Sequence, residues 1–378
     1  MARQGRRGRF LAAGGSCPLP ASPVLPVSGG ETVVRLPTVS GLEYFSESPP
    51  NAGVPLADLD GRPLSQDRVY MRNSFPMPEP GQVTGEIEVN LPGRPARTLT
   101  LDGLAGQEQV DIELVLECAG NGRSLMRPVV SGVEWGLGGA SPVRVGGMRL
   151  IDALGEVPDE VTELVFTGFD RGSVHPEGEV HFQFSVPACL VADGSALLVT
   201  HIGGAPLGLE HGGPIRLVVP GHYAMKSVKW LIRIEGVTEP FSGHFVNRYR
   251  FFGDDLLEDG SSVAEIQVRS VIARPSRGGR VTAGRVTVAG SAWSGVAAVE
   301  RVALSADRGE TWVDAELTPG PGPMAAASWR HELTLVPGMH TVMARATDTS
   351  GNTQPLVSRW NKGGYANNMV HTVEFEVV

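Results

Sequence analysis

The segment VDIELVLECAGNGRS, residues 110–124, joins a strand pattern to a thiol and to a turn rich in glycine and asparagine. Apolar residues alternate up to Cys118, while Asp111, Glu113 and Glu117 fall on the opposite face, which predicts a half-buried strand. The strand brings the thiol to its end, beside a turn whose backbone N–H groups can face an anion. The end of this strand is therefore a candidate site.

Arg123 follows the thiol by five residues and adds a fixed positive charge. A thiolate beside positive charge is stabilised and acts as a soft metal ligand or as a nucleophile. A free cysteine is also a common small core residue, and spacing alone leaves these interpretations open. A metal-free nucleophilic enzyme would need a base beside Cys118, and the sequence shows none there.

Composition narrows the function classes. A length of 378 residues predicts two domains, or three. The net charge of −9 argues against nucleic acid or an anionic membrane as partners, and no apolar run is long enough to span a membrane. Three cysteines exclude a disulfide scaffold and an all-cysteine zinc site, and without a CxxCH motif we expect no haem in this chain.

The chain divides into three parts by residue composition and by its strand and turn patterns. Residues 1–41 are rich in Pro, Gly and Ser, and we expect a poorly ordered leader that loosely resembles a twin-arginine export signal. The compartment, cytoplasmic or periplasmic, stays open. Residues 42–262 read as an α+β domain that ends in an acidic linker at 254–262. Residues 263–378 alternate between strand patterns and turns, as an immunoglobulin-like β-sandwich does.

Short Val/Leu/Ile runs between 49 glycines and 29 prolines mark the expected elements. In the first domain we expect strands at 85–91, 110–118, 163–169, 196–202 and 215–220, and short helices at 148–154 and after Pro187. In the second we expect strands within 265–276, 284–293, 297–317, 327–336 and 340–352.

Three further segments carry side chains suited to an anion. Arg72 lies in VYMRNSFPMPEP, where prolines stiffen an extended path and fix the guanidinium in place. His211 precedes two glycines, which admit a bulky ligand, and Arg216 and Lys229 can pair with its charge. Tyr249 lies between two arginines and could donate a hydrogen bond to an anionic substrate. Each segment alone also fits an ordinary surface loop or strand edge.

In chain order, RNSFPMP, ECAGNGRS, VEWGLGGAS, EHGGPIRLVVPG, KSVKWL, SAWSG, LSADRGETW and WNKGGYANN resemble the sulfite oxidase family of molybdenum enzymes. The resemblance runs from about Leu42 to the C-terminus, and CAGN-x-RS and VKWL are specific motifs. It implies an α+β molybdopterin-binding domain followed by an immunoglobulin-like domain that pairs subunits into a homodimer.

The resemblance also implies the site. Cys118 would supply the thiolate ligand to molybdenum. The catalytic residues that contact substrate would be Arg72, Arg123, Trp135 and Tyr249. The residues that bind the molybdenum–molybdopterin cofactor would be Asn73, Ser74, Asp170, His211, Arg216, Ser227 and Lys229.

The chain also departs from the family pattern. Ser74 stands where family members often have His, and Arg248 stands where they often have Asp. Near the C-terminus, where animal sulfite oxidases place a further arginine, the chain has Lys362 and then Gly363. The GYANN segment is more similar to bacterial sulfur-dehydrogenase-type members. These departures bear on the substrate rather than on the cofactor.

We therefore expect oxygen-atom transfer on a small oxyanion, with oxidation of sulfite to sulfate favoured. A separate cytochrome or a small oxidant would accept the electrons, since no haem or flavin domain is recognised. The alternatives are a reductase of the same fold acting on nitrate or a sulfoxide, and a metal-free β-rich binding protein. The resemblance leaves the direction of the reaction and the acceptor open.

Overall fold

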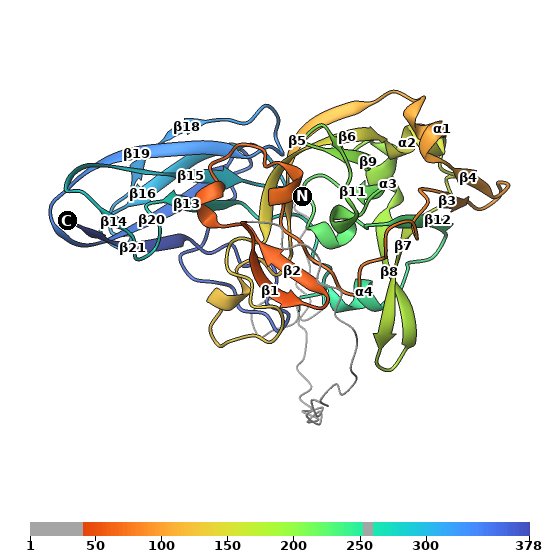
Figure 1. Cartoon of the computed structure of the whole chain (residues 1–378), viewed down its shortest axis with the longest axis horizontal. Coiled ribbons are helices and arrows are strands. Elements are labelled where there is room, and N and C mark those ends of the chain that lie inside the picture. The colour runs from red at the N-terminus through yellow and green to blue at the C-terminus, as the bar shows by residue number, and fades with distance from the viewer. Residues whose placement is uncertain (1–40, 252–259) are drawn as a thin grey trace, which may run out of the picture. The chain divides into compact units, whose positions relative to one another are not determined.

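The computed structural model describes residues 41–251 and 260–378, in which strands dominate (Figure 1). The four α-helices in these ranges have five residues each, so the first part is mostly β rather than an even mixture of helices and strands. The helices are α1 (Leu101–Ala105), α2 (Leu150–Leu154), α3 (Ala188–Ala192) and α4 (His244–Arg248). Single turns of 3-10 helix lie at Leu56–Asp58, Gln66–Arg68, Arg123–Leu125, Leu209–His211 and Ala224–Lys226.

The first part is built on a two-stranded hairpin and two five-stranded sheets. One sheet has the order β10-β9-β6-β5, with β11 paired to β9, and the other has the order β4-β3-β12-β7-β8. The hairpin is β1 (Glu43–Glu47) and β2 (Pro50–Gly53). The first sheet comprises β5 (Val110–Glu117), β6 (Ala140–Arg149), β9 (Leu197–Ile202), β10 (Ala205–Pro206) and β11 (Arg216–Val218). The second comprises β3 (Ile87–Asn90), β4 (Arg97–Leu99), β7 (Glu163–Val174), β8 (Gly178–Pro187) and β12 (Leu231–Val237).

The expected strands of this part are all present, and so are both expected helices. Their apolar residues meet in one core, in which Val143 and Leu198 of the first sheet join Phe166 and Ile234 of the second. Burial of these side chains removes apolar surface from water and holds the two sheets together.

The alternation predicted for β5 is only partly right. Leu114 and Leu116 are buried as expected, but Ile112 is 37% exposed. Glu117, expected on a solvated face, is fully buried. The reason is tertiary, because the second part of the chain covers that face: the Nε1 atom of Trp293 donates to Glu117 Oε2 at 2.7 Å.

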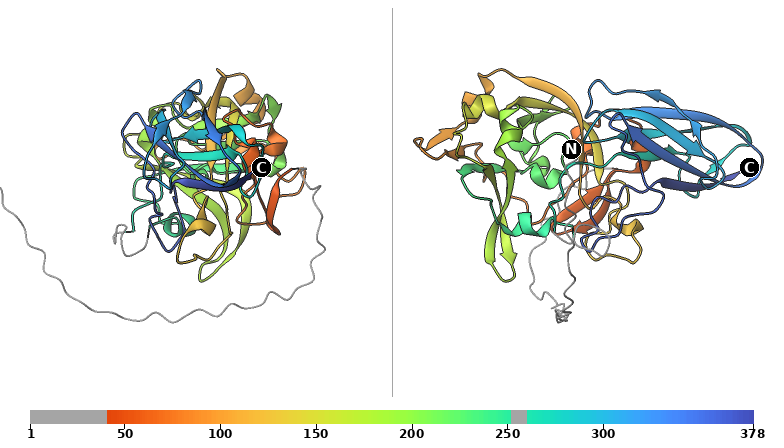
Figure 2. Two further views of the ribbon diagram at one scale, coloured as in Figure 1. Left: turned by 90° about the vertical axis from the view of Figure 1, so that its left-hand side faces the viewer. Right: turned by 180° about the vertical axis from the view of Figure 1, so that it is seen from behind.

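The second part forms two sheets around a separate core. Their orders are β13-β15-β19-β18 and β14-β21-β20-β16-β17. Buried residues from both, including Ile272, Trp329, Val302, Ala344 and Phe375, pack together. The first sheet has β13 (Arg269–Arg274), β15 (Gly284–Trp293), β18 (Glu316–Thr318) and β19 (Ala327–Leu335). The second has β14 (Arg280–Val281), β16 (Val299–Ser305), β17 (Val313–Asp314), β20 (Gly338–Asp348) and β21 (His371–Val377). The chain therefore ends in a β domain, seen from behind in Figure 2.

Several predictions fall on residues that the structure does not describe. Of the expected leader at 1–41 only Gly41 is described, and most of the expected linker at 254–262 lies outside the described ranges. Within the described ranges, no helix is both long enough and apolar enough to cross a membrane.

Candidate active site

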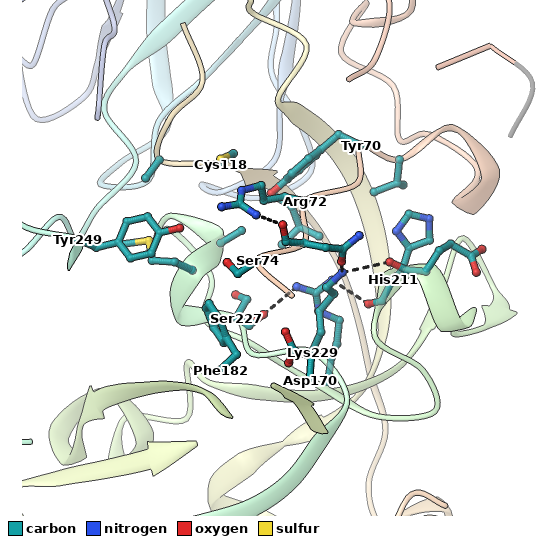
Figure 3. Close-up of a pocket in the computed structure, with 18 residues that line it drawn as sticks. Tyr70, Arg72, Ser74, Cys118, Asp170, Phe182, His211, Ser227, Lys229 and Tyr249 are labelled. Atoms are coloured by element: carbon teal, nitrogen blue, oxygen red, sulfur yellow. Dashed lines mark hydrogen bonds between the residues drawn. The ribbon is translucent and has the colours of Figure 1, made fainter. Parts of the chain in front are cut away.

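Two cavities meet at Arg72, Cys118 and Tyr249. The inner cavity encloses about 710 Å³ including its mouth, and all of its lining residues lie between 69 and 249. The outer cavity encloses about 680 Å³ and also takes lining residues from 362–365, near the C-terminus. In Figure 3, which draws the inner cavity, Cys118 and Tyr249 lie at one side and Asp170 and Lys229 at another.

Cys118 follows directly after β5 and is held by its backbone. Its N–H donates to the carbonyl of Gly139 at 2.8 Å, and its own carbonyl accepts from the N–H of Asn121 at 2.9 Å. Gly122, with φ of 84°, then turns the chain, and Arg123 begins the next 3-10 turn. The Cys118 side chain is 7% exposed and lines both cavities. The strand thus ends with a fixed thiol at the junction, as the sequence predicted.

Arg216, at the start of β11, is a buried cation that forms no ion pair with a carboxylate in the described ranges. Its guanidinium donates to the carbonyls of His211 and Ser227, each at 2.9 Å. Burial lowers the pKa of Arg216 to about 10. A guanidinium that leaves water for neutral acceptors alone is costly, and an anion in the inner cavity would offset that cost.

Lys229 lies in the same cavity and is paired weakly. Its Nζ atom donates to Asn73 Oδ1 and, at 3.3 Å, to the carbonyl of Glu210. Burial lowers the pKa of Lys229 and raises the pKa of Asp170, each of which favours the neutral form. Burial, with help from Lys229 and Arg216, lowers the pKa of His211 to about 3, so that imidazole is neutral at ordinary pH.

Asn73 and the two serines complete the polar lining. Asn73 Nδ2 donates to the carbonyl of Pro50 at 2.7 Å, which ties the cavity wall to β2. Ser227 Oγ accepts from the N–H of Val219 at 3.0 Å, so its own hydroxyl hydrogen stays available to a ligand. Ser74 lines the same cavity. The structure thus brings together all seven residues predicted to bind the cofactor.

This donor set fits a phosphate-bearing metal cofactor. The inner cavity has guanidinium, ammonium, amide and hydroxyl donors, and its lining has three cationic side chains (Arg72, Arg216 and Lys229) against two carboxylates (Asp170 and Glu210). At 41–251 and 260–378, no group of three or more His, Cys, Asp or Glu side chains could hold a metal ion. A metal at Cys118 would therefore take its remaining ligands from a cofactor, for which the inner cavity has the space and the charge.

Arg72 and Arg123 reach the junction from different loops. Arg72 donates to the carbonyl of Asn73. Burial lowers the pKa of Arg72, but the negative charge available on Tyr249 and Cys118 raises it, and the net shift is upward. Arg123, 9% exposed, donates to the carbonyls of Gly363 at 3.1 Å and Val133 at 3.0 Å. Neither guanidinium has a carboxylate partner in the described parts of the chain.

Glycines make the space that Arg123 occupies. A Cβ atom on Gly120 would lie 2.7 Å from its Nη2 atom, and one on Gly132 would lie 2.9 Å from its Nη1 atom. A Cβ atom on Gly364, whose φ is +63°, would lie 2.7 Å from its Cγ atom. Three glycines from separate loops thus hold one guanidinium in a fixed place.

Tyr249 caps the C-terminal end of α4 and is 7% exposed. Its ring packs 5.1 Å from the ring of Tyr365, centroid to centroid. The Cζ atom of Arg123 lies 5.4 Å from the Tyr365 centroid, a cation–π contact. The structure therefore brings Arg72, Arg123 and Tyr249 together around one cavity, as predicted.

Trp135 is the predicted substrate contact that lines neither cavity. It is fully buried, and its ring packs 4.9 Å from Phe45 and 6.1 Å from Tyr70. The backbone of Trp135 accepts from Ser124 and donates to Val133, so it supports the loops around Arg123. Its predicted contact with substrate stays a prediction.

Some lining residues were not predicted from the sequence. Tyr70 lines the inner cavity beside Cys118, and Tyr365 lines the outer one. The sequence offers a signal for each, since Tyr70 lies two residues before the Arg-Asn pair and Tyr365 lies in GYANN. Arg248 and Lys362, noted only as departures from the family pattern, also line the outer cavity.

Comparison with known proteins assigns families to both parts of the chain. Residues 76–245 match the oxidoreductase molybdopterin binding domain family. Residues 261–378 match the Mo-co oxidoreductase dimerisation domain family. The two matches follow one another along the chain, as in an enzyme with a cofactor domain and a dimerisation domain.

Several relatives are similar over most of the chain. Mitochondrial sulfite oxidase of Mus musculus is 33% identical over 363 residues, covering 89% of this chain and 66% of that protein. The chain thus spans slightly less than two thirds of the length of that relative. Sulfite oxidase of Gallus gallus is 31% identical over 361 residues, with 89% of this chain and 78% of that protein covered. A nitrate reductase of Hordeum vulgare is 28% identical, covering 82% of this chain and 38% of that protein.

A solved structure has the same fold. The sulfane dehydrogenase SoxCD from Paracoccus pantotrophus superposes with a TM-score of 0.77 at 23% identity, covering 92% of this chain and 93% of that chain. The fold, the two family matches and the similarity to the Gallus gallus protein agree. The chain belongs to the sulfite oxidase family of molybdopterin-dependent oxidoreductases.

Proposed function

We propose that this protein is a molybdenum-dependent oxidoreductase that transfers an oxygen atom to a small oxyanion, with sulfite the favoured substrate. The observation that carries this proposal is the pair of cation-lined cavities that meet at the buried Cys118 thiol. The overall reaction is SO₃²⁻ + H₂O → SO₄²⁻ + 2H⁺ + 2e⁻. An external cytochrome or small oxidant would take the two electrons.

The inner cavity would hold molybdenum–molybdopterin, which when bound supplies two-electron redox and oxygen-atom transfer chemistry. Cys118 would be the protein's thiolate ligand to the metal. Arg216 and Lys229 would pair with the anionic end of the cofactor, because their hydrogen-bond partners among the described residues are neutral carbonyl and amide oxygens. Asn73, Ser74, Asp170, His211 and Ser227 would supply the remaining polar contacts.

The outer cavity would hold the substrate. Arg72 and Arg123 present two fixed guanidiniums beside Cys118, an arrangement suited to the oxygens of a small anion. The Tyr249 hydroxyl lies at the same junction and would donate a hydrogen bond to the substrate. Arg123 and Tyr249 are buried and Arg72 is partly buried, which limits competing water and strengthens these contacts.

Sulfite is favoured over nitrate because the relatives named sulfite oxidase are more similar to this chain. The match to this chain also covers a larger share of their length. The identities are 33% and 31%, against 28% for the nitrate reductase, of which the chain covers only 38%. Reduction of nitrate or a sulfoxide is the second candidate within the fold.

We also propose the domain boundaries and the assembly. The cofactor domain would span 42–262 and an immunoglobulin-like dimerisation domain 263–378. Two sheets around one core support the second assignment. The match of 261–378 to a dimerisation domain favours a homodimer formed through it.

The test is molybdenum content per chain, measured on protein from a host that makes the pterin, together with its visible spectrum. We expect near-stoichiometric molybdenum and an absorption that bleaches when sulfite is added. Molybdenum without bleaching would contradict sulfite as substrate but keep the cofactor. Absence of molybdenum, in a host shown to load a control enzyme, would overturn the proposal.

A further inference from the structure

The outer cavity carries four cationic side chains at two depths. Arg72 and Arg123 lie deep, beside Cys118, whereas Arg248 and Lys362 are exposed at the mouth. No aspartate or glutamate is among the described residues that line it. A concentration of cations in a protein of net charge −9 calls for an explanation beyond solubility.

Some exposed arginines elsewhere in this protein pair with acids, and others do not. Arg144 lies 2.6 Å from Asp111, and Arg330 lies 2.8 Å from Glu316. In the described ranges, neither Arg248 nor Lys362 forms an ion pair. Among the described residues, no acidic side chain therefore competes with a ligand for the mouth cations, and the same holds for the deep pair.

Tyr365 lies next to one deep cation and one mouth cation. The face of its ring meets the Arg123 guanidinium at 5.4 Å from the ring centroid. Burial raises the pKa of Tyr365, and the nearby Arg248 and Arg123 side chains offset part of that rise. Tyr249 packs against the same ring at 5.1 Å. The tyrosine pair thus lies beside both the deep guanidinium of Arg123 and the mouth of the cavity.

We propose that Arg248 and Lys362 form a second anion subsite, so that the outer cavity takes a sulfur oxyanion bearing a second acidic group. The sulfur end binds Arg72 and Arg123, and the far acid binds the mouth pair through charge-assisted hydrogen bonds. A single small anion such as sulfite can occupy only one of the two regions. This inference rests on the proposed function for the chemistry at the sulfur end.

The substrate class that fits is a short-chain sulfinate that carries a carboxylate at its other end. Its oxidation balances as R–SO₂⁻ + H₂O → R–SO₃⁻ + 2H⁺ + 2e⁻. The electrons pass to the same external acceptor, and the sulfinate sulfur is oxidised in forming one new S–O bond.

A matched pair of unreactive product analogues tests the subsite without turnover. Propane-1-sulfonate and 3-sulfopropanoate have the same carbon count and differ only in the far-end carboxylate. Calorimetry on the molybdenum-loaded protein at low salt measures the dissociation constant of each. We expect the dianion to bind at least about tenfold more tightly, the worth of one charge-assisted contact.

Substitution of the mouth pair should remove only that advantage. In Arg248→Gln/Lys362→Gln we expect the two analogues to bind within about twofold of each other, with propane-1-sulfonate unchanged. Lys362→Gln alone should give an intermediate ratio. Arg144→Gln, an exposed arginine outside the cavity, should leave the ratio as in the unmodified protein.

Equal affinities in the unmodified protein would overturn the proposal. The proposal would also be overturned if the double variant lowered the affinity for both analogues by the same factor. That result would show a general electrostatic attraction of anions rather than a subsite for the far-end carboxylate. Neither measurement depends on sulfite oxidation. A protein that fails to bleach with sulfite but shows the expected ratio would contradict sulfite as substrate and support the subsite.

Discussion

At the residue scale, the position of Cys118 makes its thiol a candidate functional group. Its thiol is the endpoint of β5, its backbone is bonded on both sides, and two cavities open onto it. The alternation and the Gly/Asn turn were sufficient to place it at the end of a strand. The role of metal ligand, rather than nucleophile or core residue, was implied by the family resemblance, and the two cavities at the thiol support it as a proposal.

The first prediction is for Cys118→Ser. A hard hydroxyl replaces a soft thiolate poorly, so we expect turnover to fall by more than about 100-fold while the thermal midpoint stays within a few degrees. Steady-state kinetics and a thermal melt measure both. The matched control is Cys189→Ser, which alters an exposed thiol and should keep full activity. Normal turnover in the first variant would end the ligand assignment.

The second prediction is for Arg123→Met. Methionine fills a similar length but cannot pair with an anion, so kcat/KM should fall by roughly 10–100-fold, mostly through KM. Molybdenum content should not change, since Arg123 lines only the outer cavity. Elemental analysis alongside the kinetics checks both parts. Loss of the metal would make Arg123 a cofactor residue instead.

At the element scale, β13 and β21 belong to different sheets and are joined by a histidine. The N–H of Ile272 donates to His371 Nδ1 at 2.9 Å, and the imidazole is buried. A protonated Nδ1 could not accept this bond. Burial, with Arg269 and Arg277 nearby, accordingly lowers the pKa of His371 to about 4.

The third prediction is a loss of stability in mild acid. Because the folded pKa is below the ordinary value, the unfolded chain binds more protons between about pH 6.5 and 4, so stability falls as pH falls through that window. The contribution of His371 should drop by about 2 kcal/mol from pH 7 to pH 5. Urea midpoints at both pH values measure it. His371→Gln should lose that part of the pH dependence, and an unchanged slope would contradict the assignment.

The elements themselves were largely predictable, because alternation and turn residues are local. The strands in β3, β5, β7, β9 and β11 and the short helices α2 and α3 all lie where the patterns indicated. The burial of β5 was the exception. A pattern of alternating polar residues predicts which side chains face water, but it does not show what another part of the chain covers. Glu117 is covered by Trp293 of β15, which lies more than 170 residues later in the chain.

At the scale of the whole molecule, one buried network joins the two parts. The carboxylate of Glu117 lies 3.0 Å from Arg269 Nε, accepts from Trp293, and accepts from Asn121 Nδ2 at 3.0 Å. Arg269 also donates to the carbonyls of Asn121 and Asn367. The loop that follows Cys118 is thus held by residues of the C-terminal β domain.

The fourth prediction is for Arg269→Met. Removal of one partner leaves the Glu117 charge buried, which should cost about 3–5 kcal/mol of unfolding free energy. The double variant Glu117→Gln/Arg269→Met should recover a large part of that loss. Guanidinium denaturation of both variants measures the difference. A single variant within about 1 kcal/mol of the unmodified protein would show that the pair contributes little.

The family and its two successive domain matches could be predicted from ordered motifs, and so could a set of residues that line the inner cavity, although their roles stay predictions. All seven residues expected to bind cofactor line one cavity, whereas Trp135 lies behind the wall. The motif identified Trp135 but did not predict that its side chain is buried away from the cavity. That burial depends on the rings of Phe45 and Tyr70, which come from other segments of the chain. The second part of the chain contributes Tyr365 and Lys362 to the outer cavity, which no local pattern could place beside Arg248.

The two cavities also differ in when they can be completed during synthesis. Every residue that lines the inner cavity has been made once translation passes Tyr249. The outer cavity lacks part of its wall until the ribosome has also added Lys362, Gly363 and Tyr365, which come more than 110 residues after Tyr249. A nascent chain therefore contains a complete set of cofactor contacts well before it contains a complete set of substrate contacts.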